Sequence, residues 1–239
     1  DLMYETVQSI LAKSGHINHK YLKESESDKK AVIVVTANRG LAGGYNSNIT
    51  RMIIDEGFTK ENTVVYAVGK KGRELLERKG YEIKADYSEA INDPIYKDAK
   101  EICDDVLSAF ADGEVGEIYL AYTVFKNTVV HEPQLIRLLP VEADDAAHET
   151  DGSEALMTYE PSEEEALDMI IPKYVCSLVY GALIESVASE NGARMQAMDS
   201  ATSNAEEMIS TLSLKYNRAR QASITQELTE IIAGANAIE

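Results

Sequence analysis

The amino-acid sequence predicts an α/β fold, a mostly parallel sheet with flanking helices, which continues into a long C-terminal helix. Between residues 28 and 161, β-branched apolar runs alternate with segments of helical spacing, as in sheets built from right-handed crossovers. From residue 162 onward the apolar residues keep a helical period. We therefore divide the chain into the end of an N-terminal helix with a linker at 1–27, an α/β domain at 28–161, and a long helix at 162–239.

The first 14 residues have the apolar spacing of a helix. Met3, Val7 and Ile10 recur at four- and three-residue steps, and Gly15 ends the stripe. The segment 20–30 is rich in Lys, Glu, Ser and Asp, which predicts a solvated linker.

The α/β domain begins with a continuous β-branched run at 31–36, the pattern of a strand buried on both faces of a sheet. A Gly-rich turn at 38–44 separates this strand from a helix expected at 46–56. The remaining elements expected in order are a strand at 63–68, a helix at 71–78, a strand at 81–84, a helix at 91–112, strands at 117–125 and 129–140, an acidic exposed loop at 142–154, and a short strand that ends at Tyr159.

The C-terminal segment is predicted to be one very long helix. Ser162 and Glu165 form a capping-box pattern, and only Pro172 interrupts the helical period that follows. At 1.5 Å per residue the segment 172–238 is about 100 Å long, so it must project from the domain. Gly192 in its interior costs about 1 kcal/mol relative to Ala. Small and apolar residues follow a coiled-coil seam with steps of about 3.5 residues: Val175, Leu178, Ala182, Val187, Asn191, Met195, Met198, Ala201, Ala205, Ile209, Leu212, Tyr216 and Ala219.

Composition excludes several classes of protein. The chain has 23 Lys plus Arg against 41 Asp plus Glu, a formal charge of −18, which argues against nucleic-acid binding. No apolar run approaches the roughly 20 residues of a membrane span, and the first residues lack a signal-peptide pattern. Cys103 and Cys176 have no metal-like spacing, which fits a reducing compartment.

Searches for catalytic motifs find none. The turn at 38–44 matches neither a P-loop nor a GxGxxG dinucleotide turn, so a structural turn is favoured over a phosphate site. The four histidines include no HExxH pair, and no GxSxG elbow is present. We therefore expect no catalytic residue, no metal site and no cofactor.

The most unusual segment lies near the C-terminus. Polar residues reach around the predicted helix at 217–230, and periodicity alone favours a solvated face over a face enclosed by a partner. The following turn at 231–238 is apolar all round, which indicates a helix tip sheathed by another protein.

Three blocks of the sequence carry a family resemblance. They are Asn-Arg-Gly-Leu-Ala-Gly-Gly-Tyr-Asn-Ser-Asn at 38–48, the segment at 188–205 around Asn-Gly-Ala-Arg-Met-Gln-Ala-Met, and Tyr-Asn-Arg-Ala-Arg-Gln-Ala-Ser-Ile-Thr-Gln-Glu at 216–227. In these blocks, and in Tyr-Glu-Pro at 159–161, the chain resembles the gamma subunit of F-type ATP synthase in its bacterial form. The resemblance spans essentially the whole chain.

The resemblance implies a central rotor shaft rather than an enzyme. In that family the long C-terminal helix pairs with an N-terminal helix in an antiparallel coiled coil and turns inside the catalytic hexamer of alpha and beta subunits. The Rossmann-like domain forms a globular foot against the epsilon subunit and the membrane c-subunit ring, which places this chain at the cytoplasmic face of the bacterial plasma membrane as a peripheral protein. By position within the motifs, the residues implied to contact the hexamer are Arg194, Arg220, Gln221, Thr225, Glu227 and Thr229, and those implied to face the c ring and epsilon are Tyr159 and Glu160.

The sequence departs from the family pattern in two places. It starts at what corresponds to the last turns of the N-terminal helix, at 1–14. Without a partner for the seam, we expect dimerisation or fraying over 187–216. Gly192 stands where a better helix former is expected and would soften the helix locally. The regulatory dithiol of chloroplast relatives is absent, so thiol regulation is not expected. A free-standing coiled-coil adaptor with an α/β domain, and an α/β enzyme with a helical arm, are the alternative functions.

Overall fold

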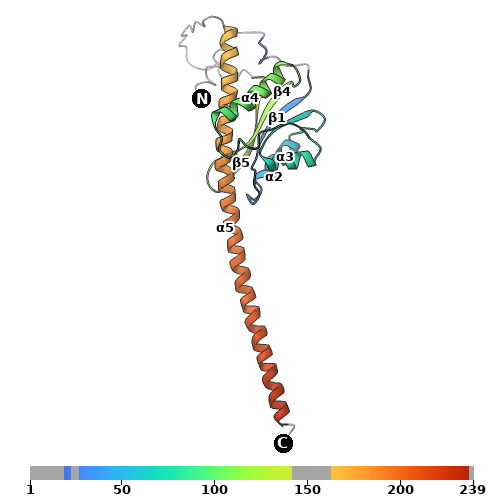
Figure 1. Cartoon of the computed structure of the whole chain (residues 1–239), viewed down its shortest axis with the longest axis vertical. Helices are drawn as coiled ribbons and strands as arrows, with labels where there is room; N and C mark the ends of the chain where they lie inside the picture. Colours follow the sequence, from blue (N-terminus) through green and yellow to red (C-terminus); the bar gives the residue numbers. More distant parts are fainter. Residues whose placement is uncertain (1–18, 23–26, 142–162, 237–239) are drawn as a thin grey trace. The chain divides into compact units, whose positions relative to one another are not determined.

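The computed structural model describes residues 19–22, 27–141 and 163–236 (Figure 1). The chain divides into two compact units, Asp1–Arg194 and Met195–Glu239. The first unit contains an α/β domain together with the first part of the long helix. The second unit contains the rest of that helix.

A five-stranded sheet forms the centre of the α/β domain, with the strand order β3-β2-β1-β4-β5. Three parallel pairings join the first four strands, and β5 runs antiparallel to β4. The strands are β1 at Lys30–Val35, β2 at Thr63–Val68, β3 at Glu82–Asp86, β4 at Glu117–Phe125 and β5 at His131–Leu139. The prediction of a mostly parallel sheet is confirmed, because β1 and β2 lie in its interior and are almost entirely apolar and buried.

Helices cover both faces of the sheet. Side chains of α2 and α3 bury one apolar cluster against β1 and β2, while α4 and the first part of α5 bury a larger cluster on the opposite face. The helices are α2 at Tyr45–Asp55, α3 at Lys70–Arg78, α4 at Tyr96–Ala111 and α5 at Glu163–Asn236. Flanking helices and the long C-terminal helix are therefore confirmed.

Helix α4 begins later than the sequence suggested. Ile91 is 3% exposed and packs into the large cluster from a turn, so its apolar character reflects a buried loop rather than a first helical turn. Pro94 lies in this turn, and helical backbone geometry is disfavoured at the residue that precedes a proline. The helix starts where the Asp98 carboxylate accepts a hydrogen bond of 3.1 Å from the backbone N–H of Ile95.

The first part of α5 buries a stripe against the domain. Pro172 lies inside the helix, which continues past it without a break. Buried side chains recur at three- and four-residue steps: Leu167, Ile171, Val175, Val179, Ala182, Leu183, Ser186 and Ser189. The predicted seam shares Val175 and Ala182 with this stripe, and both side chains pack on the sheet side of the domain rather than remaining free for a second helix.

An 18-residue window of α5 also has the length and composition of a membrane span, with a mean hydropathy of 1.5 and 39% of the window buried. The apolar stripe from Leu167 to Leu183 accounts for this property, because its side chains belong to the core of the domain.

Several sequence predictions lie outside the described residues. They are the helix at 1–14, the loop at 142–154, the strand that ends at Tyr159, and the N-cap at Ser162.

Candidate functional site

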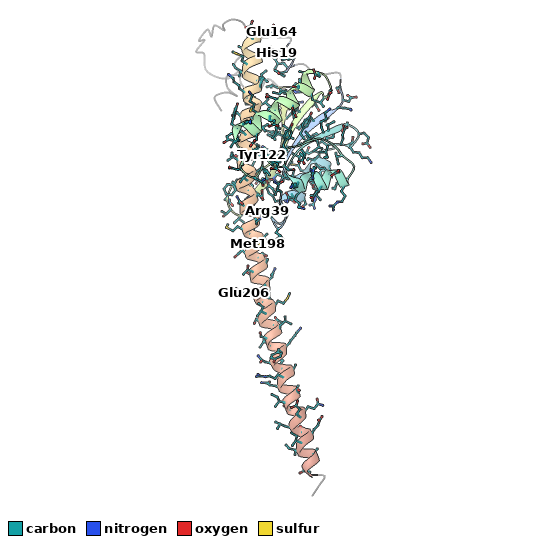
Figure 2. All side chains as sticks on the ribbon, in the orientation of Figure 1. His19, Arg39, Tyr122, Glu164, Met198 and Glu206 are labelled. Atoms are coloured by element: carbon teal, nitrogen blue, oxygen red, sulfur yellow. The ribbon has the colours of Figure 1, made fainter. Side chains whose placement is uncertain are left out.

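The second part of α5 carries the largest set of exposed apolar side chains among the described residues. From Met198 to Gly234 every described side chain is exposed, as Figure 2 shows for Met198 and Glu206. The large apolar side chains exposed on the second unit are Met195, Met198, Met208, Ile209, Leu212, Leu214, Tyr216, Ile224, Leu228, Ile231 and Ile232. An exposed apolar patch of this extent marks an interaction surface.

Five predicted contact residues lie on this segment, and their spacing places them on two lines that run along the helix surface. Arg220 lies one turn from both Tyr216 and Ile224, so its face of the helix is mainly apolar. Glu227, seven residues after Arg220, lies on the same face. Two side chains of opposite charge, Arg220 and Glu227, thus lie within an exposed apolar stripe.

Gln221, Thr225 and Thr229 form the second line at four-residue steps. The Thr229 hydroxyl donates a hydrogen bond of 2.8 Å to the backbone carbonyl oxygen of Thr225. This local bond leaves all three side chains exposed. They form a polar edge beside the apolar stripe.

Arg194 belongs to the other compact unit. Its guanidinium Nη2 lies 2.6 Å from the Glu190 carboxylate Oε1, one turn earlier on α5, and the two side chains are 25% and 14% exposed. Arg194 is therefore held on the domain side of the boundary, whereas the other five predicted contact residues lie in the exposed unit. Tyr159 and Glu160, predicted to face the c ring and epsilon, lie outside the described residues.

The usual ligand crevice of an open α/β sheet is filled by the chain itself. Such crevices lie at the carboxyl ends of the strands where the strand order reverses, here between β1 and β4. The Tyr45 hydroxyl donates a hydrogen bond of 3.0 Å to the backbone oxygen of Ser186 on α5. Burial raises the pKa of the Tyr45 hydroxyl. The Ser189 hydroxyl donates a bond of 3.1 Å to the backbone oxygen of Thr123 at β4. Helix α5 thus packs against the carboxyl ends of β1 and β4.

The Gly-rich turn after β1 binds to neighbouring loops of the same chain. The Asn38 side-chain amide donates a hydrogen bond of 2.7 Å to the backbone oxygen of Ser88, and its oxygen accepts one of 3.0 Å from the backbone N–H of Lys70. The backbone N–H of Ala37 binds the Asn46 side-chain oxygen at 2.9 Å. These bonds support the structural interpretation of the turn.

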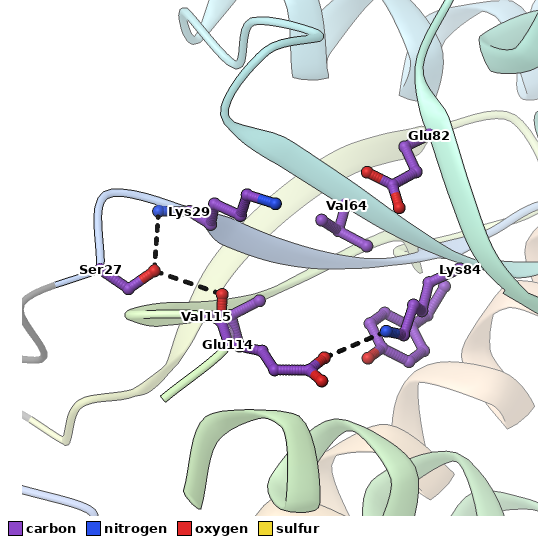
Figure 3. A pocket seen from close by; sticks show the side chains of 8 residues that line it. Ser27, Lys29, Val64, Glu82, Lys84, Glu114 and Val115 are labelled. Atoms are coloured by element: carbon purple, nitrogen blue, oxygen red, sulfur yellow. Dashed lines mark hydrogen bonds and ion pairs between the residues drawn. The ribbon is translucent and has the colours of Figure 1, made fainter. Parts of the chain in front are cut away.

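A cavity of about 390 Å³ lies at the opposite edge of the sheet, where the parallel strands begin (Figure 3). Two of the charged side chains that line the cavity form an ion pair with each other, because Lys84 Nζ lies 3.0 Å from Glu114 Oε2. The Ser27 hydroxyl donates a hydrogen bond of 3.2 Å to the backbone oxygen of Glu114. The cavity therefore has a mixed-charge wall without a convergent catalytic set.

The two thiols are both buried, at 1% exposure for Cys103 and 3% for Cys176. Burial raises the pKa of the Cys103 thiol, which disfavours the reactive thiolate. Within the described residues, no group of three or more His, Cys, Asp or Glu side chains could hold a metal ion.

Comparisons with known proteins identify the family. A family model described as ATP synthase matches residues 1–238. The ATP synthase gamma chain of Lachnoclostridium phytofermentans is 66% identical over 244 residues, which cover 100% of this chain and 84% of that protein. The chain belongs to the ATP synthase gamma-chain family. It is thus a subunit of a rotary, membrane-associated complex.

Other gamma chains and solved structures agree with this assignment. The sodium ion specific gamma chain of Acetobacterium woodii is 41% identical, covering 100% of this chain and 84% of that protein. A chain of the Euglena gracilis mitochondrial ATP synthase, in an assembly described as OSCP/F1/c-ring, matches with a TM-score of 0.66 and 18% identity, covering 99% and 86% of the two chains. A chain of the Tetrahymena thermophila central stalk and c-ring structure matches with a TM-score of 0.59 and 24% identity, covering 82% and 86%. At these identities the structural likeness concerns the gamma-chain fold.

Sequence reasoning missed the residues that attach α5 to the carboxyl edge of the sheet. Ser186 and Ser189 are fully buried, although serine is mostly exposed in proteins. A small polar residue on the buried stripe of a helix is the signal that could have found Ser189, whose hydroxyl makes the bond. Ser186 binds through its backbone oxygen, and its own hydroxyl has no partner among the described residues. Tyr45, the residue that binds Ser186, gave no such signal because it lies 141 positions away.

Proposed function

We propose that this gamma chain is the central rotor shaft of its ATP synthase, transmitting torque between the c ring and the catalytic hexamer. The observation that carries the proposal is the second part of α5, a continuous helix exposed on all sides and bearing a long apolar stripe. From Met195 to Asn236 this segment is about 60 Å long at 1.5 Å per residue. It offers a rod for a surrounding partner, and the compact α/β unit offers a second coupling surface.

The proposed partners follow from the two units. The alpha and beta subunits would enclose the exposed part of α5, with Arg220, Gln221, Thr225, Glu227 and Thr229 at the contact. The other proposed contacts are Arg194 with the hexamer, and Tyr159 and Glu160 with the c ring and epsilon. The shaft would lie at the cytoplasmic face of the bacterial plasma membrane.

The proposed role is not catalytic. The carboxyl edge of the sheet, where α/β enzymes bind substrates, is filled by Tyr45, Ser186 and Ser189. ATP chemistry would then take place in the alpha and beta subunits, and this chain would contribute mechanical coupling.

Rotation sets a physical requirement on the contacts. A partner shifts a conformational equilibrium only by its differential affinity for the states, so a shaft bound much more tightly at one angle would be trapped there. Exposed side chains on two helical lines, Arg220 with Glu227 and Gln221 with Thr225 and Thr229, suit contacts that form and break with angle.

Substitution Gln221→Leu tests this role. It removes one polar group from an exposed helix position, so the free energy of unfolding should change by no more than about 0.5 kcal/mol. We expect lower coupled ATPase activity in a complex reassembled with alpha, beta and epsilon subunits. Gln226→Leu, the same change on a different face of the same turns, is the matched control. Unchanged turnover with Gln221→Leu would remove the proposed role, and failure of the unsubstituted chain to assemble would favour the adaptor alternative.

A further inference from the structure

Gly192 of α5 lies against the ring of His131, the first residue of β5. A Cβ atom added at Gly192 would lie 2.6 Å from His131 Cε1, closer than real Cβ contacts come, and 3.0 Å from Nε2. It would also lie 3.5 Å from Cε2 of Phe125, the last residue of β4. The sequence predicts that Gly192 softens the helix locally. The structure adds a packing role, because the missing side chain leaves the space that the His131 ring fills.

Packing contacts, rather than hydrogen bonds, hold the His131 ring in this position. Its centroid lies 5.8 Å from that of Phe125, with the ring planes tilted by 32°. Both ring nitrogens are buried and have no hydrogen-bond partner among the described residues. A buried polar group without a partner costs free energy, so this placement needs a compensating gain from packing. That gain comes from the contacts with Phe125 and the bare backbone at Gly192.

Gly192 is the third of three evenly spaced attachments, and the next residue, Ala193, packs against the cluster of Ala37, Ala42 and Tyr45. The backbone oxygen of Ser186 accepts a hydrogen bond of 3.0 Å from the Tyr45 hydroxyl, and the Ser189 hydroxyl donates one of 3.1 Å to the backbone oxygen of Thr123. The three α5 residues follow at three-residue steps along one face of the helix. Beyond Ala197 every described side chain of α5 is exposed up to Gly234.

We propose that Gly192 and His131 form one joint of a clamp through which twisting load passes between the α/β domain and the exposed part of α5. The inference rests on the rotor-shaft function proposed above. Gly192 acts as a positioning residue. It admits the His131 ring to the helix backbone, so the helix is fixed against the hairpin of β4 and β5 shortly before its described side chains all become exposed at Met198.

The physical basis is close packing. Protein interiors transmit strain because they contain few voids, and an inserted methyl group forces a shift of side chains or backbone. An alanine at Gly192 would push the His131 ring or the helix out of place. The helix would remain intact, because alanine is the better helix former, but the joint would loosen.

Gly192→Ala in the complete, membrane-reconstituted ATP synthase tests the proposal. Gly181→Ala is the matched control, because it is the same change in the same helix and its Cβ would meet nothing within 4 Å. The readout is ATP-driven ion pumping divided by ATP hydrolysis. We expect this ratio to fall about three- to tenfold for Gly192→Ala and to stay at the unsubstituted value for Gly181→Ala.

His131→Ala provides the rescue. In the double variant Gly192→Ala/His131→Ala the clashing ring is absent. We expect a moderately reduced ratio of pumping to hydrolysis for His131→Ala alone. The ratio of the double variant should recover to that level. The proposal is overturned if Gly192→Ala lowers thermal stability without changing the ratio, if Gly181→Ala lowers the ratio equally, or if His131→Ala gives no rescue. Failure of the unsubstituted chain to assemble or pump would instead refute the proposed function.

Discussion

At the scale of single residues, the contact between Gly69 and Thr36 shows how closely the loops meet at the carboxyl edge of the sheet. Gly69 has a φ of 117°, and a Cβ at this position would lie 2.1 Å from the backbone oxygen of Thr36. The Thr36 hydroxyl also accepts a hydrogen bond of 2.9 Å from the backbone N–H of Gly72. This junction aligns the loops after β1 and β2.

Gly69→Ala should therefore be severely destabilising. The clash is with backbone, which cannot move aside cheaply, so we expect a loss of more than about 3 kcal/mol in urea unfolding. Gly57→Ala is the control, since Gly57 has a φ of 81° but open space around its Cβ. It should lose only about 1 to 2 kcal/mol from the left-handed conformation. Equal losses for the two variants would contradict the steric argument.

Asp168 contributes a pH-dependent term to stability. Its carboxylate Oδ1 lies 2.8 Å from Lys20 Nζ, and this hydrogen bond lowers the pKa of Asp168. Because the folded-state pKa lies below the unfolded one, the stabilisation is present above the unfolded pKa, about 3.9, and is lost as the pH falls through the folded pKa. Asp168 is 43% exposed, so solvent screening limits the effect to about 1 kcal/mol or less.

Asp168→Asn should accordingly lower the free energy of unfolding near neutral pH and lose this effect in acid. Urea unfolding of both proteins between about pH 6 and pH 3 measures the difference. Asp199→Asn, at an exposed position on the same helix, serves as the control. A difference that stays constant over the whole range would rule out the assigned pKa shift.

At the scale of elements, α5 combines two environments within one continuous helix. Up to Ser189 its stripe is buried in the domain, whereas from Met198 its apolar side chains are exposed. Isolated helices gain little stability from propensity alone and depend on packing. The two parts of α5 should therefore differ in local stability.

Hydrogen exchange on the isolated chain tests this difference. Amides from Met198 to Gly234 should exchange faster than those from Leu167 to Ser189, because few buried contacts oppose local opening. Dimerisation through the exposed stripe is the other expected outcome, and dilution would then restore fast exchange. A monomer with uniform protection along α5 would contradict the account.

The elements also show what the sequence could predict. The strand at 63–68 was predicted at its observed bounds, and that at 31–36 was misplaced by one residue, because continuous β-branched runs are a strong local signal. The start of α4 was wrong by five residues, since an apolar side chain such as Ile91 can be buried from a turn as well as from a helix.

Contacts between distant residues could not be predicted in this way. Cys103 and Cys176 are far apart in sequence, yet both lie in the core cluster shared by α4 and α5. The role of Gly192 likewise depends on His131, which only the hairpin of β4 and β5 brings to the helix. The proposed hexamer contacts came from the family resemblance, and the structure shows only that five of them lie on an exposed helix.

At the scale of the whole molecule, the chain combines a compact α/β unit with an exposed helical unit. Within the first unit, the hydrogen bonds of Ser186 and Ser189 and the packing of Gly192 hold the first part of α5 against the α/β domain. The apolar stripe of the second unit is available to a partner. A subunit of this construction can pass a twist from one partner to another without chemistry of its own.

The most direct test is to observe rotation of the α/β domain in a complex with the alpha and beta subunits. A cysteine introduced by Lys79→Cys at an exposed position can carry a visible probe, because the two native thiols are only 1% and 3% exposed. With the hexamer fixed to a surface, ATP should drive continuous rotation of the probe in one direction, and rotation should stop when ATP is removed. A complex that assembles and hydrolyses ATP while the probe stays still would contradict the central claim that this chain is the rotor shaft.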